Sequence, residues 1–449
     1  MKVAKFGGSS VASAEQFRKV ANIVTADSDR RIIVVSAPGK RYKEDVKMTD
    51  LLISLADKVN SGEDFTKEFL LIIKRYAEIV KELELSTEII ETLAHNLDTI
   101  LEGNKHDQNQ LIDALKASGE DNNAKLMAFY LTSLGYEANY MNPKDAGIVV
   151  SNERGRVQIL PESYDRLKRL REHNGILVIP GFFGYSPEGT LVTFSRGGSD
   201  ITGSIVAAGV QANLYENFTD VDSIYCVNPA IVKNPKEIKE LTYREMRELS
   251  YAGFSVFHDE ALHPVFKAHI PVCVKNTNNP DASGTFIVAE RDHRKQSVAG
   301  IASDSGFCSI YISKYLMNRE IGFGRRLLQI LEDEGISYEH TPSGIDNMSI
   351  ILREHQLKGD AENRVLDRIQ TELEVDDISI ERDLAMVMVV GEGMADAIGI
   401  AAKATEAFAK TQVNIEMINQ GSSEVSMMFG VKASALNNAV QSLYDAYFQ

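Results

Sequence analysis

Tryptophan is absent from the 449 residues, and cysteine occurs only three times, at Cys226, Cys273 and Cys308. An odd number of widely separated cysteines argues against a disulfide framework and provides no metal-ligand spacing. Sparse cysteine fits a reducing compartment, so we expect a cytoplasmic protein. No run of about 18 apolar residues is present, and the first residues lack the apolar segment of a signal peptide, which argues against membrane insertion and secretion.

An excess of positive charge is also missing, because 48 Lys and Arg face 64 Asp and Glu and give a formal net charge of −16. Nucleic acids and anionic membranes both attract basic surfaces, so we expect neither as a partner. The net charge still allows a local basic pocket. The nine histidines show no paired ligand spacing, and no metal site of the protein itself is predicted. The length allows two to four domains.

Strand-like and helix-like segments alternate in the first part of the chain. Strands are expected at residues 2–6, 31–36, 175–179 and 272–274, and helices at 14–26 and 123–134. The segment 31–36 is apolar nearly throughout and is flanked by helical segments, which is typical of a parallel sheet covered on both faces. The pattern predicts an α/β fold.

A repeat follows near the C-terminus. Residues 307–352 align without gaps on residues 384–429, and the matched pairs include Met317/Met394, Gly322/Gly399, Glu339/Glu416, Gly344/Gly421 and Ser349/Ser426. Each copy reads strand, helix, strand, strand, and a further helical segment follows it; in the first copy the second strand is expected at 336–340. This β-α-β-β-α order suits a ferredoxin-like module, and the repeat is too long for a solenoid. We predict a duplicated module.

The first chemical motif is a strand that runs from Lys5 into Gly7, Gly8 and Ser9 before a helix. Glycines let the backbone approach a bound group, and the free N–H groups of a helix start favour an anion. Lys5 could place a cation on phosphates. The motif is neither the Walker loop nor the Rossmann fingerprint, and a plain strand-to-helix turn would explain it equally well.

The strongest motif is residues 193–200, Thr-Phe-Ser-Arg-Gly-Gly-Ser-Asp, which opens a helix of small residues. Arg196 can clamp a carboxylate or phosphate through two hydrogen bonds, and the paired glycines allow close backbone approach. Asp200 could orient a nucleophile or a cation near the phosphates. Ser199 or Asp200 could instead be a simple N-cap, but an N-cap needs neither the arginine nor the glycines.

Two acidic motifs complete the set. Glu120, just before the helix expected at 123–134, could accept a substrate ammonium group or could merely favour the helix dipole. Asp220 and Tyr225, after a strand-like segment at 213–217, could hold a ribose and a base or could form an ordinary turn. Ligands of α/β sheets bind beyond the carboxyl ends of the strands. The motifs together predict a phosphate-handling enzyme for a small charged substrate, which they do not identify.

The motifs at 5–10, 118–120, 195–200 and 219–221 resemble those of aspartate kinases in the same order, and the duplicated module resembles the paired ACT domains of that family. The resemblance covers essentially the whole chain. It implies an amino-acid-kinase (carbamate-kinase-like) three-layer α/β/α sandwich over residues 1–292, followed by ferredoxin-like ACT modules at 305–375 and 376–449. We expect a monofunctional kinase, because the chain ends after the repeat and leaves no length for the homoserine dehydrogenase domain of some relatives.

The resemblance implies transfer of the ATP γ-phosphoryl to the β-carboxylate of L-aspartate, giving 4-phospho-L-aspartate, the first step toward lysine, threonine and methionine. Mg²⁺ would arrive on the ATP phosphates. The implied catalytic residues are Lys5, Arg196 and Asp200. The implied aspartate-binding residues are Thr49, Glu120, Phe182, Arg196 and Ser199. The implied ATP-binding residues are Lys5, Gly7, Gly8, Ser9, Ser36, Thr219, Asp220, Tyr225 and Lys275.

The nucleotide side departs from the family pattern. Many relatives carry an arginine where this chain has Ala230, a lysine at the place of Ser255 and a proline at the place of Asp259. Lys275 is our substitute for the missing cation, and Lys233 is the second candidate.

The ACT modules imply feedback inhibition by an amino acid and a homodimer or homotetramer formed through these modules. We expect lysine as the effector, with threonine, or both together, left open. The implied effector residues are Met317, Gly322, Phe323, Ser337, Tyr338 and Glu339. An acidic Glu339 suits the ammonium groups of lysine, but Glu416 occupies the same place in the second copy, so a solvated structural role is also open.

Two alternatives remain. Glutamate, acetylglutamate and uridylate kinases share the glycine turns of this fold but lack the paired ACT modules. A catalytically inactive amino-acid sensor would have lost Lys5 or Arg196, and both are present. A nicotinamide dehydrogenase is disfavoured because no Rossmann fingerprint follows the first strand.

Overall fold

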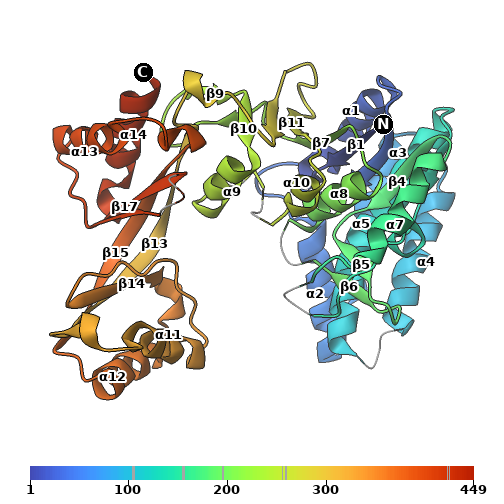
Figure 1. Cartoon of the computed structure of the whole chain (residues 1–449). Coiled ribbons are helices and arrows are strands. Elements are labelled where there is room, and N and C mark those ends of the chain that lie inside the picture. The colour runs from blue at the N-terminus through green and yellow to red at the C-terminus, as the bar shows by residue number, and fades with distance from the viewer. Residues whose placement is uncertain are drawn as a thin grey trace. The chain divides into compact units, whose positions relative to one another are not determined.

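The computed structural model describes residues 1–103, 107–153, 157–194, 197–254, 256–257, 260–421, 423 and 425–449. The chain forms two compact units (Figure 1). The N-terminal unit comprises Met1–Ile224, Glu237–Met246 and Val256–Arg291, and the C-terminal unit comprises Tyr225–Lys236, Arg247–Ser255 and Asp292–Gln449. No helix among the described residues is long and apolar enough to cross a membrane.

The N-terminal unit is built on an eight-stranded sheet of order β10-β12-β11-β7-β1-β2-β4-β3. All neighbouring strands are parallel except β11 and β12. The strands are β1 (Lys2–Phe6), β2 (Arg30–Val35), β3 (Ala138–Tyr140), β4 (Ile176–Pro180), β7 (Leu214–Thr219), β10 (Glu240–Thr242), β11 (Val272–Asn276) and β12 (Thr285–Val288). The predicted mainly parallel sheet is confirmed.

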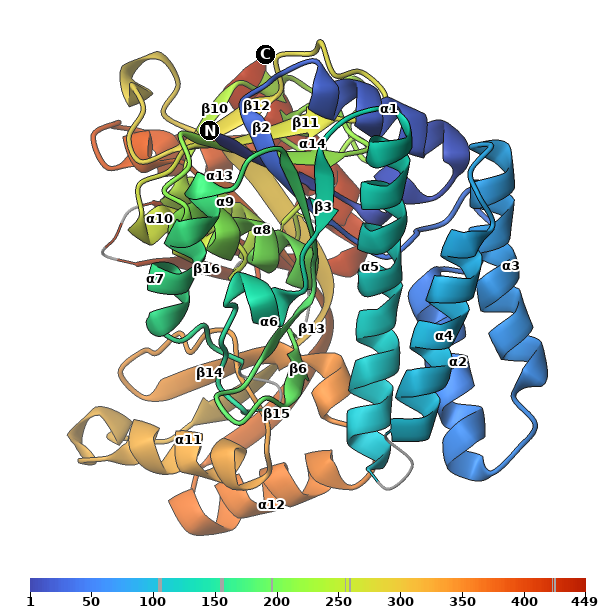
Figure 2. The same ribbon diagram turned by 90° about the vertical axis from the view of Figure 1, so that its right-hand side faces the viewer.

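Helices cover both faces of this sheet. One face packs against α1 and α5, and the other face packs against α8. Helices α2, α3 and α4 pack against α5 and one another, and α2 to α5 stand side by side in Figure 2. The helices of this part are α1 (Ala14–Thr25), α2 (Met48–Ser61), α3 (Thr66–Glu82), α4 (Glu88–Gly103), α5 (Gln108–Ser133), α6 (Pro143–Ala146), α7 (Glu162–Lys168), α8 (Gly198–Gly209) and α10 (His263–Lys267). Helix α9 (Tyr243–Tyr251) belongs to the N-terminal unit up to Met246 and to the C-terminal unit from Arg247. Short elements are η1 (Gly8–Val11), η2 (Arg169–Glu172) and the pairs β5 (Phe183–Tyr185) with β6 (Leu191–Thr193) and β8 (Ile224–Tyr225) with β9 (Glu237–Ile238).

The sequence misplaces the start of one helix. A helix was expected at 123–134 with Glu120 before it, but α5 begins at Gln108, so Glu120 lies in its middle. The central residues from Ala117 to Ala124 are all buried, although several are polar. A helix that is buried on every side lacks the amphipathic period from which its length could be read.

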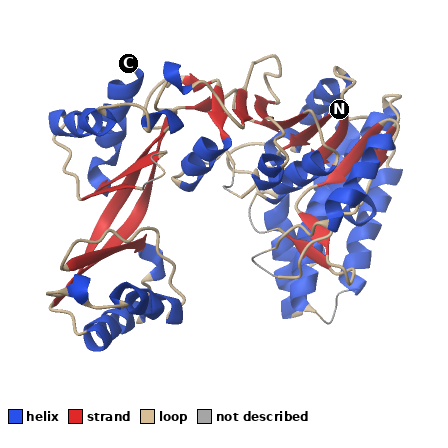
Figure 3. Ribbon diagram, in the orientation of Figure 1, coloured by secondary structure: helices blue, strands red, loops and turns tan. Residues whose placement is uncertain are grey.

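The C-terminal unit contains an antiparallel five-stranded sheet of order β14-β13-β15-β17-β16, drawn in red in Figure 3. Its strands are β13 (Gly300–Ser313), β14 (Asn347–Arg353), β15 (Asp377–Val390), β16 (Met417–Gln420) and β17 (Ser426–Lys432). Its helices are α11 (Phe323–Asp333), α12 (Ala361–Leu373), α13 (Ile400–Lys410) and α14 (Leu436–Phe448), with short turns η3 (His293–Lys295), η4 (Met317–Arg319), η5 (Glu354–Gln356), η6 (Glu392–Met394) and η7 (Ala433–Ala435).

The long strands β13 and β15 belong to both repeats. Gly300 pairs with Val390 at one end and Ser313 with Asp377 at the other, with irregular register between Ser305 and Ser309. Residues 300–305 therefore extend the sheet of the second module, and residues 377–381 extend that of the first.

The repeat is visible in the backbone. Helices α11 and α13 start at equivalent positions, each after a glycine in the left-handed region, Gly322 (φ 82°) and Gly399 (φ 91°). One expected element is missing, because residues 336–340 contribute a single bridge, from His340 to Ile351, instead of a strand.

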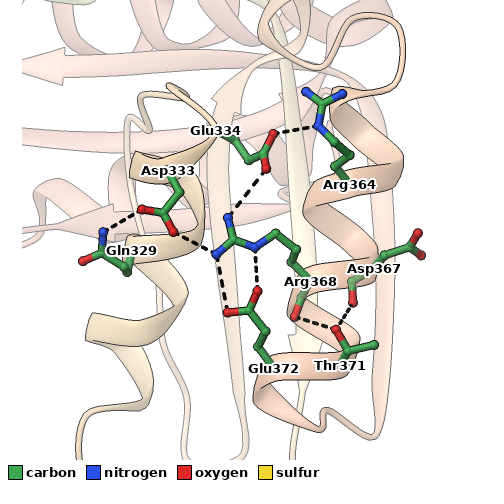
Figure 4. Close-up of polar contacts among 8 residues, drawn as sticks. All are labelled: Gln329, Asp333, Glu334, Arg364, Asp367, Arg368, Thr371 and Glu372. Atoms are coloured by element: carbon green, nitrogen blue, oxygen red, sulfur yellow. Dashed lines mark hydrogen bonds and ion pairs between the residues drawn. The ribbon is translucent and has the colours of Figure 1, made fainter.

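An ion network joins α11 to α12 on the surface of the first module (Figure 4). Arg368 lies 2.6 Å from Glu372, 2.8 Å from Asp333 and 3.6 Å from Glu334 (nitrogen to oxygen). Its hydrogen bonds to Glu372 and Asp333 raise the pKa of Arg368. Arg364 contacts Glu334 at 2.9 Å.

Candidate active site

A lysine and a carboxylate meet at the carboxyl edge of the sheet. Lys5 is the fourth residue of β1, and its Nζ lies 2.6 Å from Oδ1 of Asp200 in the first turn of α8. Nδ2 of Asn217 donates to the same oxygen at 2.6 Å. Lys5 and Asn217 are direct neighbours in the parallel pairing of β1 with β7. The structure thus brings Lys5 and Asp200, two of the predicted site residues, into direct contact.

The glycine turn after β1 packs against the loop after β2. The amide of Gly39 donates to the carbonyl of Gly8 at 2.8 Å, and a Cβ on Gly39 would lie 2.5 Å from the carbonyl carbon of Gly8. The amide of Gly7 donates to the carbonyl oxygen of Phe218 at 3.1 Å. The amide of Ser36, directly after β2, donates to the carbonyl oxygen of Phe6 at 3.1 Å. Gly7, Gly8 and Ser36 thus lie together at the edge that carries Lys5, and the exposed Ser9 follows in η1.

A buried ion pair supports this loop and was not found from the sequence. Arg75 of α3 lies 3.0 Å from Asp45, and its guanidinium donates to the carbonyl oxygens of Gly39 and Val46. Hydrogen bonds from Arg41 hold the pKa of Asp45 well below its ordinary value against the opposing effect of burial. Nothing in the local sequence around Arg75 distinguishes it from the other charged residues of a helix.

Glu120 is buried, and one of its carboxylate oxygens makes no hydrogen bond among the described residues. Its side chain is 5% exposed, and its Oε2 has no hydrogen-bond partner among the described residues. Burial raises the pKa of Glu120 to about 8, although the backbone of Ala37 and the charge of Lys5 oppose the shift. A buried carboxylate is costly unless it is paired, so this arrangement suits a cationic ligand group. Because Glu120 lies in the middle of α5, it cannot act by stabilising the dipole at the start of that helix.

The turn after β4 packs against the start of α8. A Cβ on Gly181 would lie 2.5 Å from Oγ of Ser199, so these two residues touch. Phe182 adopts a left-handed backbone (φ 80°), and its amide donates to Thr202 of α8 at 3.0 Å. Thr49 is half-buried near the start of α2 and follows Met48, whose amide donates to Pro38 at 3.2 Å. Ser195 and Arg196 lie outside the described residues.

The nucleotide residues fall on several strand ends. Thr219 ends β7, and its carbonyl accepts from the amide of Thr277 at 2.9 Å. Asp220 is exposed and accepts from the Thr219 hydroxyl at 3.2 Å. Lys275 lies within β11 rather than after it, because the strand continues to Asn276; it pairs with Phe218. Tyr225, at the end of β8, and the exposed Lys233 belong to the C-terminal unit. Ser255, His258 and Asp259 lie outside the described residues.

The predicted effector residues lie in different environments of the first module. Met317 and Phe323 pack in the apolar core of the first module. Glu339 instead accepts a hydrogen bond from Tyr251 and lies 3.4 Å from Nε of Arg353. The remaining three are the αL residue Gly322, Ser337 bonded to Gln356, and the exposed Tyr338.

Comparisons with known proteins agree with this architecture. A model of the amino acid kinase family matches residues 1–276, and a model of an ACT domain matches residues 387–447. Aspartokinase 3 of Bacillus subtilis is 60% identical, and the match covers 100% of this chain and 99% of that protein. The crystal structure of Clostridium acetobutylicum aspartate kinase matches with a TM-score of 0.88 and 40% identity, over 100% of both chains. The structure of E. coli aspartokinase III in complex with aspartate and ADP matches with a TM-score of 0.80 and 25% identity, also over 100% of both. The chain therefore belongs to the aspartokinases of the amino acid kinase family and is an aspartate kinase with ACT regulatory domains.

Proposed function

We propose that the edge of the sheet around Lys5 and Asp200 is where the γ-phosphoryl group of ATP passes to the β-carboxylate of L-aspartate. The observation that carries this proposal is the 2.6 Å contact between Lys5 and Asp200 beside the glycine turn of residues 7–8. Phosphoryl transfer depends mainly on positioning and on offsetting the charge of the moving group. The nucleophile needs no base, because a carboxylate is already ionised at neutral pH.

The aspartate side is proposed to rest on Glu120. Its unpartnered Oε2 would accept the substrate ammonium, which would compensate the buried charge. Arg196 would clamp a substrate carboxylate through two hydrogen bonds, and Thr49, Phe182 and Ser199 would support substrate binding.

The ATP side is proposed to rest on the backbone of Gly7, Gly8 and Ser9, with Lys5 on the transferred phosphoryl and Ser36 nearby. Thr219, Asp220, Tyr225 and Lys275 would hold the nucleoside. Mg²⁺ would be held chiefly by the ATP phosphates and would supply charge neutralisation, and the hydroxyl of Ser9 is an oxygen donor of the kind that this ion prefers.

The C-terminal unit is proposed to bind an amino-acid effector, with lysine as the first candidate and threonine as the second, in a homodimer or homotetramer. A carboxylate at Glu339 suits an ammonium group. Its contacts with Tyr251 and Arg353 mean that an effector amine would replace or join existing partners.

The test is ADP release measured with Mg-ATP and L-aspartate, with and without lysine, threonine or both. Lys5→Met should lower kcat by at least about a hundredfold, in the range of losses seen when one charge-stabilising donor is removed. Lys2→Met is the matched control, since Lys2 lies on the same strand and pairs with Asp27 at 2.7 Å. Near-normal turnover of Lys5→Met would refute the assignment of the site.

A further inference from the structure

We propose that Asn217 is a positioning residue for phosphoryl transfer, which holds the Asp200 carboxylate while Lys5 engages the phosphates; the inference rests on the roles proposed above for Lys5 and Asp200. Nδ2 of Asn217 lies 2.6 Å from Oδ1 of Asp200, the same oxygen that Nζ of Lys5 contacts at 2.6 Å. One carboxylate oxygen is thus shared by a charged donor and a neutral donor.

Asn217 sits where an apolar residue would be the ordinary choice. It is 3% exposed on β7, a central strand with β1 on one side and β11 on the other. A buried amide costs free energy unless its hydrogen bonds are made, so an asparagine here requires a fixed partner. Asp200 is that partner, and the ladder pairing of Asn217 with Lys5 fixes the register of both donors.

Tyr215 binds the backbone of Asp200 through a further hydrogen bond. Its hydroxyl donates to the carbonyl oxygen of Asp200 at 3.2 Å and accepts from Nδ2 of Asn217 at 3.3 Å. The ring fits under α8 because Gly203 has no side chain; a Cβ there would lie 2.5 Å from the Tyr215 oxygen. Strand β7 therefore holds both the main chain and the carboxylate of Asp200.

The reaction explains why two donors are needed. When Lys5 turns toward the phosphoryl oxygens, Asp200 loses its cationic partner. A carboxylate left free to rotate would repel the anionic phosphates, whereas the bond from Asn217 keeps it aimed away from them. The neutral amide does this without competing with the phosphates for Lys5.

Two variants of Asn217 test the inference in the ADP-release assay. Asn217→Leu removes the donor at similar volume and should lower kcat by about tenfold or more while the KM values for ATP and aspartate change little, which marks an interaction needed in the transition state. Asn217→Asp places a second carboxyl beside Asp200. The two carboxyls would share a proton at low pH and regain the hydrogen bond, so the kcat of this variant should rise, relative to the parent, as the pH falls.

The controls separate positioning from folding. Asn139→Leu changes an exposed asparagine on the edge strand β3 of the same sheet and should leave kcat unchanged. Tyr215→Phe keeps the ring and removes one donor, so its loss should be smaller than that of Asn217→Leu. A merely structural defect would lower the rate of Asn217→Asp in the same proportion at every pH.

A kcat of Asn217→Leu within about twofold of the parent would overturn the inference. If that variant fails to fold, a pH profile of Asn217→Asp identical in shape to that of the parent would overturn it equally. If Lys5→Met loses activity while the Asn217 variants keep the kcat of the parent, the inference about Asn217 is refuted and the proposed site stands. Normal activity in Lys5→Met would refute the proposed site, and the inference with it.

Discussion

The hydroxyl of Tyr251 donates a hydrogen bond to the carboxylate of Glu339, so the last residue of α9 is tied to the first ACT module. Arg353 adds a second bond to Glu339, an ion pair of 2.6 Å to Asp304 and a stacked contact, 4.1 Å above the ring of Phe307. A small cavity borders this cluster, with Met386 and Met388 in its wall. Glu339 is therefore a member of a built polar cluster rather than a solvated surface residue.

Two substitutions distinguish the possible roles of Glu339. Glu339→Ala should reduce inhibition by the amino-acid effector while turnover without the effector is retained. Tyr251→Phe removes only the hydroxyl contact and leaves the carboxylate free for an effector amine. Effector titrations of both variants decide the outcome, because a change in Glu339→Ala alone indicates ligand binding. An equal change in both indicates that the contact itself transmits the effect, and unchanged inhibition in both would place the effector elsewhere.

The aspartate affinity should depend on pH through Glu120. Because burial raises the pKa of Glu120 to about 8, the carboxyl is mostly protonated at neutral pH, and a proton must leave before it can bind an ammonium. The KM for aspartate should therefore fall as the pH rises toward 8, by up to about tenfold per unit. Glu120→Gln should give a high KM that lacks this dependence. A parallel pH dependence in parent and variant would assign the titration to another group.

Glu120→Gln should weaken aspartate binding but stabilise the folded protein at high pH. The folded protein favours the protonated form of Glu120, and this stabilisation is complete below the unfolded pKa near 4.5 and is lost as the pH rises through about 8. Glu120→Gln keeps a neutral side chain at every pH. Its melting temperature, measured by circular dichroism, should therefore exceed that of the parent at pH 9 and approach it toward pH 4. A lower melting temperature at pH 9 would show that the carboxylate is compensated within the protein.

The parts of the site that follow from local sequence could be predicted. Lys5 and the glycines could be named as candidates because an apolar strand runs directly into paired glycines, and Asp200 because Gly197 and Gly198 precede a helix of small residues. The span of α5 could not be predicted, since burial on all sides removes its periodicity. The hydrogen bond from Asn217 to Asp200 could not be predicted either, because Asp200 is brought to Asn217 only by the packing of α8 on the sheet.

The close approach of Gly39 to Gly8 predicts a strict requirement for glycine. A Cβ on residue 39 would lie 2.8 Å from the carbonyl oxygen of Gly8 and 2.8 Å from the amide of Ser9, and neither backbone atom can yield like a side chain. Gly39→Ala should raise the KM for ATP by about tenfold or more and lower the melting temperature, as overpacking does in well-packed sites. Gly103→Ala, at the end of α4, is the control and should change neither, because no atom of the described residues lies within 4 Å of its added Cβ. Normal ATP kinetics in Gly39→Ala would show that the turn after β1 does not depend on this contact.

The ion network between α11 and α12 should contribute to stability in a salt-dependent manner. Arg368 joins three carboxylates, so Arg368→Met removes all of these attractions and leaves the like charges of Asp333, Glu334 and Glu372 close together. The melting temperature should fall by a few degrees at low salt, and the difference should nearly vanish at about 1 M salt, where the screening length is about 3 Å. Arg325→Met is the matched control, since Arg325 is exposed on α11 and has no ion pair among the described residues. Turnover without effector should be the same in both variants. A loss of stability in Arg368→Met that persists at high salt would mean that the arginine acts through the packing of its aliphatic stem rather than through its charge.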